Sequence, residues 1–491
     1  MWLTVASVHG VGSRIASSAL AGGVRVLRET RDAPPSIAAF RYSPSACPRC
    51  CDLVSTEVRS LKTQTHSGEG HLVHDSGPAP EEPAWPTWPV HTEKTEEHLL
   101  AALRSGRWAV SGAYTGTPSY EQAFADAFAA YTGTTHAVPT CNGSAALTIT
   151  LEALGVGAGD EVLVPGLTWV ACASSVLRVG AVPVLVDVEP DTLCMSVAAA
   201  EAAITERTRA VMVVHLYGSA ADLDGFTELC HRRGVALLED CSHVHGATWR
   251  GRRLGAFGDA AAFSLQQTKL LTSGEGGVAV TSDPEIHNRL YRKRVDGRRR
   301  RQGTPLGELE LEELPGVQGY NYCMSEFNAA VALDGLGRLD EENARRRVAM
   351  RRLDELLADI DGVAPPARPA ALTEDAAYQY CIRLDPAVFG PGAKHAVAAV
   401  MSQHLGLNVE PIDSALSDNV LYQPLASGWF RPALDPRRAR ELDPSRFSLP
   451  VAEAAGESAV VLPHRMFLAP PERMELIATA VEKARAQLSR T

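Results

Sequence analysis

The sequence predicts an α/β protein built on a large, mostly parallel sheet, and three observations support this. Short apolar segments alternate with helical segments between residues 136 and 239. The loops that join them are short and polar, which is typical of strands buried beneath helices. Polar residues also gather where several of these strands end, and open parallel sheets bind their ligands at that edge.

The predicted elements follow one another in a regular order. Two helices come first, at Thr95–Ser105 and Tyr120–Tyr131, and the second carries Phe124 and Phe128 on one face. The alternating region then contains strands at His136–Pro139, Glu161–Pro165, Val182–Asp187, Ala210–His215 and Val235–Glu239, with helices at Gly143–Leu154, Trp169–Val179, Val197–Ile204 and Leu223–Arg233.

The C-terminal part predicts a second, smaller α/β domain. A helix at Met324–Leu336 continues into an Arg/Glu-rich helix at Asp340–Leu357, and Tyr378–Leu384 is a predicted strand. We therefore predict a large domain over residues 83–345 and a small domain over residues 346–491.

Residues 1–82 differ from the rest of the chain. They lack a sustained helical or strand period after about residue 30, and Cys47 and Cys50 form the only CxxC pair near His66, His71 and His74. A structural zinc site needs four ligands at matched spacing. We predict no metal and a disordered or non-native N-terminal extension, followed by a proline-fixed segment that contains Trp85 and Trp88.

Composition limits the class of protein. The chain has 491 residues, 45% of them apolar and 21% charged, as in a globular protein. Its net charge of -11 argues against nucleic-acid binding, and no apolar run approaches the length of a membrane span. Ten cysteines, mostly single and within apolar segments, favour free thiols in the cytoplasm.

Lys269 is the first candidate for catalysis. Arginine greatly outnumbers lysine in this chain, and only a lysine can lose its proton and form a Schiff base with a carbonyl. Lys269 follows the apolar strand Ala260–Phe263 and a polar run, and the glycine-rich stretch Thr272–Gly277 comes after it, before a strand at Val278–Thr281. This setting suits an aldehyde cofactor beside a phosphate, although a surface lysine in a hairpin loop has the same local pattern.

Other candidates lie at strand ends. Asn142, Gly143 and Ser144 stand between a strand and a helix, where backbone N–H groups can bind a phosphate. Trp169 and Asp240 each follow a strand, and an aromatic core residue or a capping aspartate would give the same pattern.

Five motifs in this order resemble the DegT/StrS family, the fold-type I PLP-dependent aminotransferases that act on keto sugars and cyclitols. They are NGSAAL (142–147), GDEVLVPGLTWVA (159–171), LLEDCSHVHGA (237–247), FSLQQTKLLTSGEGG (263–277) and GYNYCMSEFNAAV (319–331). The resemblance covers the chain from about Trp85 onward. It implies pyridoxal 5'-phosphate (PLP) as the cofactor.

The resemblance also implies a role for each matching residue. Lys269 forms the Schiff base with PLP and later moves the proton, Asp240 pairs with the pyridinium nitrogen, and Trp169 stacks on the ring. The phosphate is held by Gly143, Ser144 and Ser264, with Asn321 reaching it from the partner of a homodimer with shared sites. Two positions depart from the family pattern: His243 replaces a common Gln beside the cofactor hydroxyl, and Cys323 replaces a common Arg.

The segment Gln266–Lys269 is similar to that of aminotransferases that act on cyclitol ketones such as scyllo-inosose. This implies a transfer of the amino group from an amino acid, with L-glutamine as the usual donor, to a keto-cyclitol or keto-sugar in aminoglycoside-type antibiotic biosynthesis. Gln266 is the residue that would bind substrate hydroxyls.

Two alternatives remain open at this stage. One is a PLP dehydratase or aromatising enzyme of the same fold, similar to aminohydroxybenzoate synthase. The other is a non-catalytic PLP-binding regulator that binds nucleic acid through the basic run Arg292–Arg301, which by composition is otherwise a solvated loop.

Overall fold

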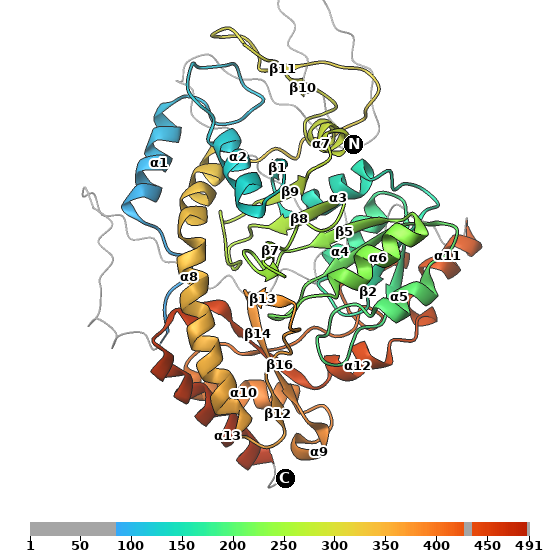
Figure 1. Ribbon diagram of the computed structural model, residues 1–491, viewed down its shortest axis with the longest axis vertical. Coiled ribbons are helices and arrows are strands. Elements are labelled where there is room, and N and C mark those ends of the chain that lie inside the picture. The colour runs from blue at the N-terminus through green and yellow to red at the C-terminus, as the bar shows by residue number, and fades with distance from the viewer. Residues whose placement is uncertain (1–84, 427–434, 489–491) are drawn as a thin grey trace, which may run out of the picture. The chain divides into compact units, whose positions relative to one another are not determined.

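The computed structural model describes residues 85–426 and 435–488, and its central feature is a seven-stranded sheet (Figure 1). Neighbouring strands follow the order β1 (His136–Thr140), β9 (Gly277–Thr281), β8 (Ala260–Ser264), β5 (Ala236–Asp240), β4 (Thr208–Val214), β2 (Glu161–Pro165) and β3 (Val182–Val186). Within this sheet, β9 alone runs in the direction opposite to all the other strands. The predicted, mostly parallel sheet is confirmed. The predictions for residues 1–82, including the absence of zinc, lie outside the described residues.

Helices that precede or follow the strands in the chain pack against this sheet. They are α2 (Tyr120–Thr132), α3 (Gly143–Ala153), α4 (Ala171–Arg178), α5 (Val197–Ala203), α6 (Leu223–Arg233) and α7 (Pro284–Arg294). Most start where the sequence supplies a side-chain cap, because Ser119, Asn142 and Asp222 each accept a hydrogen bond from a backbone N–H of the first turn. The predictions for α3 and α6 match to within one residue.

The helix predicted from Trp169 instead begins at Ala171. The side chain of Val170, the N-cap residue, cannot accept a hydrogen bond from a backbone N–H. No side-chain cap therefore stabilises a helix that starts before Ala171. Thr168 and Trp169 consequently belong to the loop after β2, and this position matters for the site described below.

One long helix, α8 (Glu326–Ala358), links the large sheet to a second, smaller sheet (Figure 1). The sequence predicts two consecutive helices here, whereas the structure has one continuous helix of 33 residues. It packs against α1 (Glu93–Arg104) and α2 near its start and against α13 (Met474–Leu488) near its end. The predicted domain boundary at residues 345 and 346 falls inside α8 and stays a prediction.

A second, four-stranded antiparallel sheet lies in the C-terminal part of the chain, and we call it the small sheet. Its order is β12 (Val363–Ala364), β14 (Gln379–Leu384), β16 (Ala459–Pro463) and β15 (Glu410–Pro411). Together with α10 (Lys394–Leu405) and α13 it encloses its own hydrophobic core, which includes Tyr380, Val397 and Phe467. Short elements complete the described chain: β6 (Thr248–Trp249), β7 (Arg252–Arg253), β10 (Arg299–Arg300), β11 (Leu311–Glu312), β13 (Leu372–Glu374), α9 (Pro386–Phe389), α11 (Pro436–Leu442) and α12 (Pro450–Gly456).

The basic run at residues 292–301 is not the solvated loop that composition suggested. Arg294 ends α7, is fully buried and forms an ion pair with Glu121. Arg299 lies in the β10–β11 hairpin, where it pairs with Glu312, and Arg301 pairs with Glu308. The acidic segment that follows the basic run therefore neutralises much of it.

None of the helices in the described ranges combines the length and apolar character needed to cross a membrane.

Candidate active site

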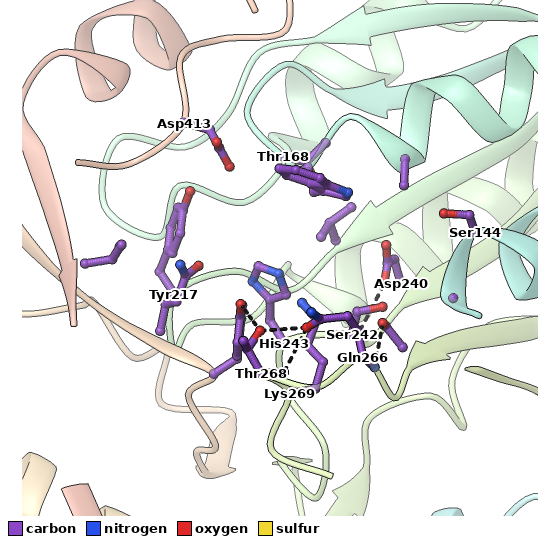
Figure 2. Close-up of a pocket in the computed structure, with 18 of the residues that line it drawn as sticks. Ser144, Thr168, Tyr217, Asp240, Ser242, His243, Gln266, Thr268, Lys269 and Asp413 are labelled. Carbon is purple, nitrogen blue, oxygen red and sulfur yellow. Dashed lines mark hydrogen bonds between the residues drawn. The ribbon is translucent and has the colours of Figure 1, made fainter. Parts of the chain in front are cut away.

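A cavity of about 390 Å³ opens at the carboxyl edge of the parallel strands. Its walls come from the loops after β2, β4, β5 and β8, from the first turn of α3, and from the small sheet (Figure 2). Eight of the nine site residues predicted from the sequence line it: Gly143, Ser144, Trp169, Asp240, His243, Ser264, Gln266 and Lys269. Residues that are as much as 126 positions apart in the sequence therefore line the same cavity.

Lys269 stands in a turn between β8 and β9, held by a hydrogen bond from its backbone N–H to the carbonyl of Gln266 (2.9 Å). Its Nζ lies 3.8 Å from the centre of the Tyr378 ring. Burial lowers the pKa of this amine to about 8, although the negative charge of Asp240 opposes the shift. A substantial fraction of Lys269 is therefore neutral at physiological pH, which is the form that attacks a carbonyl.

Asp240 ends β5 with its side chain almost fully buried. Its Oδ1 accepts the backbone N–H of Ser242 (3.0 Å), and its Oδ2 accepts the thiol of Cys172 (3.2 Å). These two bonds fix the carboxylate in one orientation toward the cavity. A buried, oriented carboxylate suits a protonated ring nitrogen, because the two charges compensate each other.

The first turn of α3 meets the strand that carries Ser264. A Cβ added to Gly143 would lie 2.8 Å from Cβ of Ser264, so only glycine fits there. A Cβ on Gly277 would similarly lie 2.5 Å from the carbonyl oxygen of Asn142. The close approach places the N–H groups at the start of α3 beside the Ser144 and Ser264 hydroxyls, a set of neutral donors that fits a phosphate.

Two rings complete the side of the cavity that the large sheet forms. Trp169 lies in the loop before α4, lines the cavity, and keeps about half of its surface exposed. His243 is buried and packs edge-on against Tyr378, with ring centres 4.7 Å apart. Burial, reinforced by the charge of Lys269, holds the pKa of His243 well below its usual range, so the ring is neutral.

Gln266 uses part of its amide to build the turn before Lys269. Its Oε1 accepts the N–H of Thr268 (2.8 Å) and the Thr268 hydroxyl (2.7 Å), and that hydroxyl also bonds to the Tyr378 hydroxyl (2.7 Å). Because the oxygen is engaged, the part of Gln266 that remains for a ligand is its NH₂ group.

The structure adds lining residues that the sequence did not single out. Tyr217 follows β4, Tyr378 and Gln379 lie at the start of β14, and Glu410 and Asp413 lie in and after β15. Most come from the small sheet, more than 100 residues after Lys269, and no spacing or motif connects them to it. Asn321, in contrast, is exposed and does not line the cavity of its own chain.

A reactive lysine, an oriented carboxylate and a neutral phosphate cradle at the edge of a parallel sheet define a class of α/β enzymes that hold an aldehyde cofactor on a lysine. Comparison with known proteins gives the family. The DegT/DnrJ/EryC1/StrS aminotransferase family matches residues 89–423, and the chain belongs to it. The protein is thus a PLP-dependent aminotransferase, as the five motifs indicated.

Similar curated proteins extend over most of the chain. L-glutamine:scyllo-inosose aminotransferase of Streptomyces griseus is 46% identical, covering 84% of this chain and 97% of the relative. L-glutamine:2-deoxy-scyllo-inosose aminotransferase of Streptomyces fradiae is 45% identical, covering 81% and 94%. Among solved structures, 3-amino-5-hydroxybenzoic acid synthase is 30% identical with a TM-score of 0.71, covering 83% of this chain and all of that one. The higher identities support the aminotransferase prediction over both alternatives.

Proposed function

We propose that this enzyme transfers the amino group of L-glutamine to a keto-cyclitol or keto-sugar, and that the acceptor is a ketone of the scyllo-inosose type. The observation that carries the proposal is the 46% identity, over 84% of the chain, to a glutamine:scyllo-inosose aminotransferase. The cavity volume of about 390 Å³ supports it, because pockets for small cofactors and substrates lie in that range.

The cavity residues take the following roles in this proposal. PLP, when bound, supplies an electron sink that allows an amino group to be exchanged. Lys269 holds the cofactor aldehyde and moves the proton at its Nζ, and Asp240 keeps the ring nitrogen protonated. Trp169 packs on the ring, and His243, neutral, accepts or donates one hydrogen bond beside it.

Binding of the phosphate falls to the start of α3. Gly143 and Ser144 donate backbone N–H groups, and Ser264 adds a hydroxyl. These neutral groups surround a charged phosphate without adding a cation to the cavity. Gln266 donates its NH₂ to a substrate hydroxyl, because its oxygen already accepts two bonds from Thr268.

We further propose a cytoplasmic homodimer with shared sites that acts in aminoglycoside-type antibiotic biosynthesis. Exposed apolar side chains support the dimer: Leu100 and Leu103 on α1, Trp108, and Leu306 and Leu309 before β11. A role in nucleic-acid binding is disfavoured, because the net charge is -11 and arginines of the basic run pair with glutamates.

The test is a screen of the purified enzyme with glutamine, glutamate and alanine against keto-inositols and keto-sugars, with products identified by mass spectrometry. We expect glutamine and a keto-inositol to give an amino-inositol. Formation of an aromatic or dehydrated product, or amination only of nucleotide-linked keto-sugars, contradicts the proposal.

A further inference from the structure

The wall of the cavity opposite Lys269 carries two carboxylates. Figure 2 shows Asp413 across the cavity from Lys269, on the side formed by the small sheet. Glu410 lies three residues earlier, in β15, and lines the same cavity. Both belong to the part of the chain that no motif connected to the site.

The side chain of Asp413 faces the cavity (Figure 2). Within the described residues, its carboxylate has no hydrogen-bond or ion-pair partner, whereas Glu410 accepts one bond from Asn408 (2.9 Å). Burial, and then the charge of Glu410, raise the pKa of Asp413. A polar group that is partly desolvated and left without a partner costs free energy unless a ligand supplies the bond.

The charge of the cavity limits what that ligand is. Among the described residues that line it, Lys269 is the only lysine or arginine, while Asp240, Glu275, Glu410 and Asp413 are carboxylates. A phosphate or nucleotide group placed beside Asp413 and Glu410 would meet like charges, and Lys269 is the only described cation in the cavity lining that could compensate them. Hydroxyl groups, in contrast, donate charge-assisted hydrogen bonds to carboxylates.

A second polar group of the cavity also lacks a partner, although the proposed function gives one of its hydrogen bonds to the cofactor. His243 lines the cavity, is 8% exposed, and its Nδ1 has no hydrogen-bond partner within the described residues. With Tyr217 and Gln379 on the adjoining wall, the groups around the cavity offer acceptors and donors but little positive charge. Such a lining suits a ring that carries hydroxyls on several sides.

We propose that Asp413, assisted by Glu410, binds the hydroxyl groups of a neutral polyhydroxylated acceptor and excludes acceptors that carry a phosphate or nucleotide. The inference rests on the proposed function and adds to it the residues that select the acceptor. The carboxylates hold the hydroxylated side of the ring while its ketone faces Lys269. Selection therefore comes from the small sheet, whereas the cofactor-binding residues come from the large one.

The test compares Asp413→Asn and Glu410→Gln with the matched control Asp418→Asn, which removes a charge from an exposed position five residues further along the same segment. The donor half-reaction is followed by cofactor absorbance with glutamine alone. The acceptor half is followed as kcat/KM for the ketone that the wild-type enzyme aminates. Thermal unfolding checks that each variant folds.

We expect Asp413→Asn to lower kcat/KM for the acceptor by about tenfold or more, mainly through KM, because a hydrogen bond to a charged group becomes a neutral one. Glu410→Gln should have a smaller effect in the same direction. The donor half-reaction should lose much less than the acceptor half-reaction in Asp413→Asn and Glu410→Gln, and Asp418→Asn should match wild type throughout.

Binding measured without turnover separates this inference from the proposed function. Protein fluorescence is titrated with myo-inositol and with inositol monophosphate. We expect wild type to bind myo-inositol in preference, and Asp413→Asn to lose that preference. The inference is wrong if Asp413→Asn leaves the acceptor kinetics unchanged or lowers both half-reactions equally. It is also wrong if the wild-type enzyme binds inositol monophosphate in preference to myo-inositol. If no keto-inositol is aminated but the binding preference holds, only the proposed function fails.

Discussion

The thiol of Cys172, on α4, donates a hydrogen bond to Oδ2 of Asp240 at 3.2 Å and also lies 3.4 Å from the Thr168 hydroxyl. Burial and the neighbouring negative charge of Asp240 raise the pKa of Cys172 well above its usual range, so the thiol stays protonated. We therefore propose that Cys172 is a positioning residue, which acts on the proposed cofactor site through Asp240.

Replacing Cys172 tests this relationship. We expect Cys172→Ala to weaken PLP binding by about fivefold, since one hydrogen bond contributes about 1 kcal/mol. Cys172→Ser keeps a donor and should stay close to wild type. The measurements are the PLP dissociation constant and the absorbance maximum of the bound cofactor. Equal behaviour of the alanine and serine variants would show that only volume matters at this position.

The reactivity of Lys269 should follow its pKa of about 8. An amine attacks an aldehyde only when it is neutral, so PLP uptake by cofactor-free enzyme should speed up as the pH rises through 8 and level off above it. Stopped-flow absorbance between pH 6.5 and 9.5 measures this. Asp240→Asn removes a charge that raises the pKa, and should move the midpoint to lower pH. A midpoint near the ordinary lysine pKa in wild type contradicts the argument.

Chemical labelling tests directly whether Lys269 is the lysine that binds PLP. Borohydride reduction of the loaded enzyme followed by peptide mapping should place the pyridoxyl group on Lys269, and Lys269→Ala should carry none. A label on another lysine ends the assignment.

Glu239, next to Asp240, is a second buried carboxylate near the carboxyl end of β5. Its carboxylate accepts the N–H groups of Gly255 (2.9 Å), Phe257 (2.8 Å) and Gly258 (2.8 Å). It also lies 3.4 Å from His215 Nε2 and close to Cys241, a group that could otherwise hold a metal. Since both oxygens are already engaged, we interpret this cluster as structural.

We expect Glu239→Ala to lower the free energy of unfolding by about 3 kcal/mol, because it leaves buried N–H groups unsatisfied. Urea unfolding measures this, with the exposed Glu206→Ala as control, expected within about 0.5 kcal/mol of wild type. A Glu239→Ala protein as stable as the control would show that water replaces the carboxylate.

Much of the fold and half of the cavity follow from local signals. Apolar strands, caps such as Asn142 and a glycine at 143 are properties of neighbouring residues, so the large sheet and its edge could be predicted. Tyr378 and Asp413 could not, because they reach Lys269 only through the packing of the small sheet. The start of α4 was also missed: whether Trp169 enters the helix depends on the missing cap, which a periodic apolar pattern does not show.

Removal of the N-terminal segment should define where the folded enzyme begins. Trp85 is buried and its Nε1 donates to the carbonyl of Leu405 (2.8 Å), while Trp88 donates to the carbonyl of Gln267 (3.0 Å), two residues before Lys269. We expect deletion of residues 1–82 to leave PLP binding, activity and thermal unfolding unchanged.

Deletion of residues 1–88 provides the contrast, because it removes both tryptophans. It should lower the unfolding temperature and reduce activity by disturbing the turn that carries Lys269. Loss of folding on deletion of 1–82, or one zinc ion per chain in the full-length protein, contradicts the prediction for this segment.

The last prediction concerns Asn321, which is exposed and absent from the cavity of its own chain. Its backbone forms a bridge with Val295, and its Oδ1 accepts the N–H of Cys323 (3.4 Å), so its amide nitrogen stays available to a neighbour. In our proposal that neighbour is the PLP phosphate of the partner subunit, which uncharged donors can hold. Each site of the homodimer then needs Lys269 from one chain and Asn321 from the other.

Subunit exchange separates this arrangement from a site made by one chain. Lys269→Ala lacks the lysine, and Asn321→Asp places a negative charge against the phosphate, so each protein alone should be inactive. In a mixed dimer, the chain that keeps Lys269 receives an intact Asn321 from its partner. An equal mixture should therefore recover about a quarter of the wild-type sites, because half of the dimers are mixed and each has one complete site. Each variant incubated alone under the same exchange conditions should recover none. If mixed dimers form, as tagged subunits would show, and no activity returns, or if a monomer is fully active, each site belongs to a single chain.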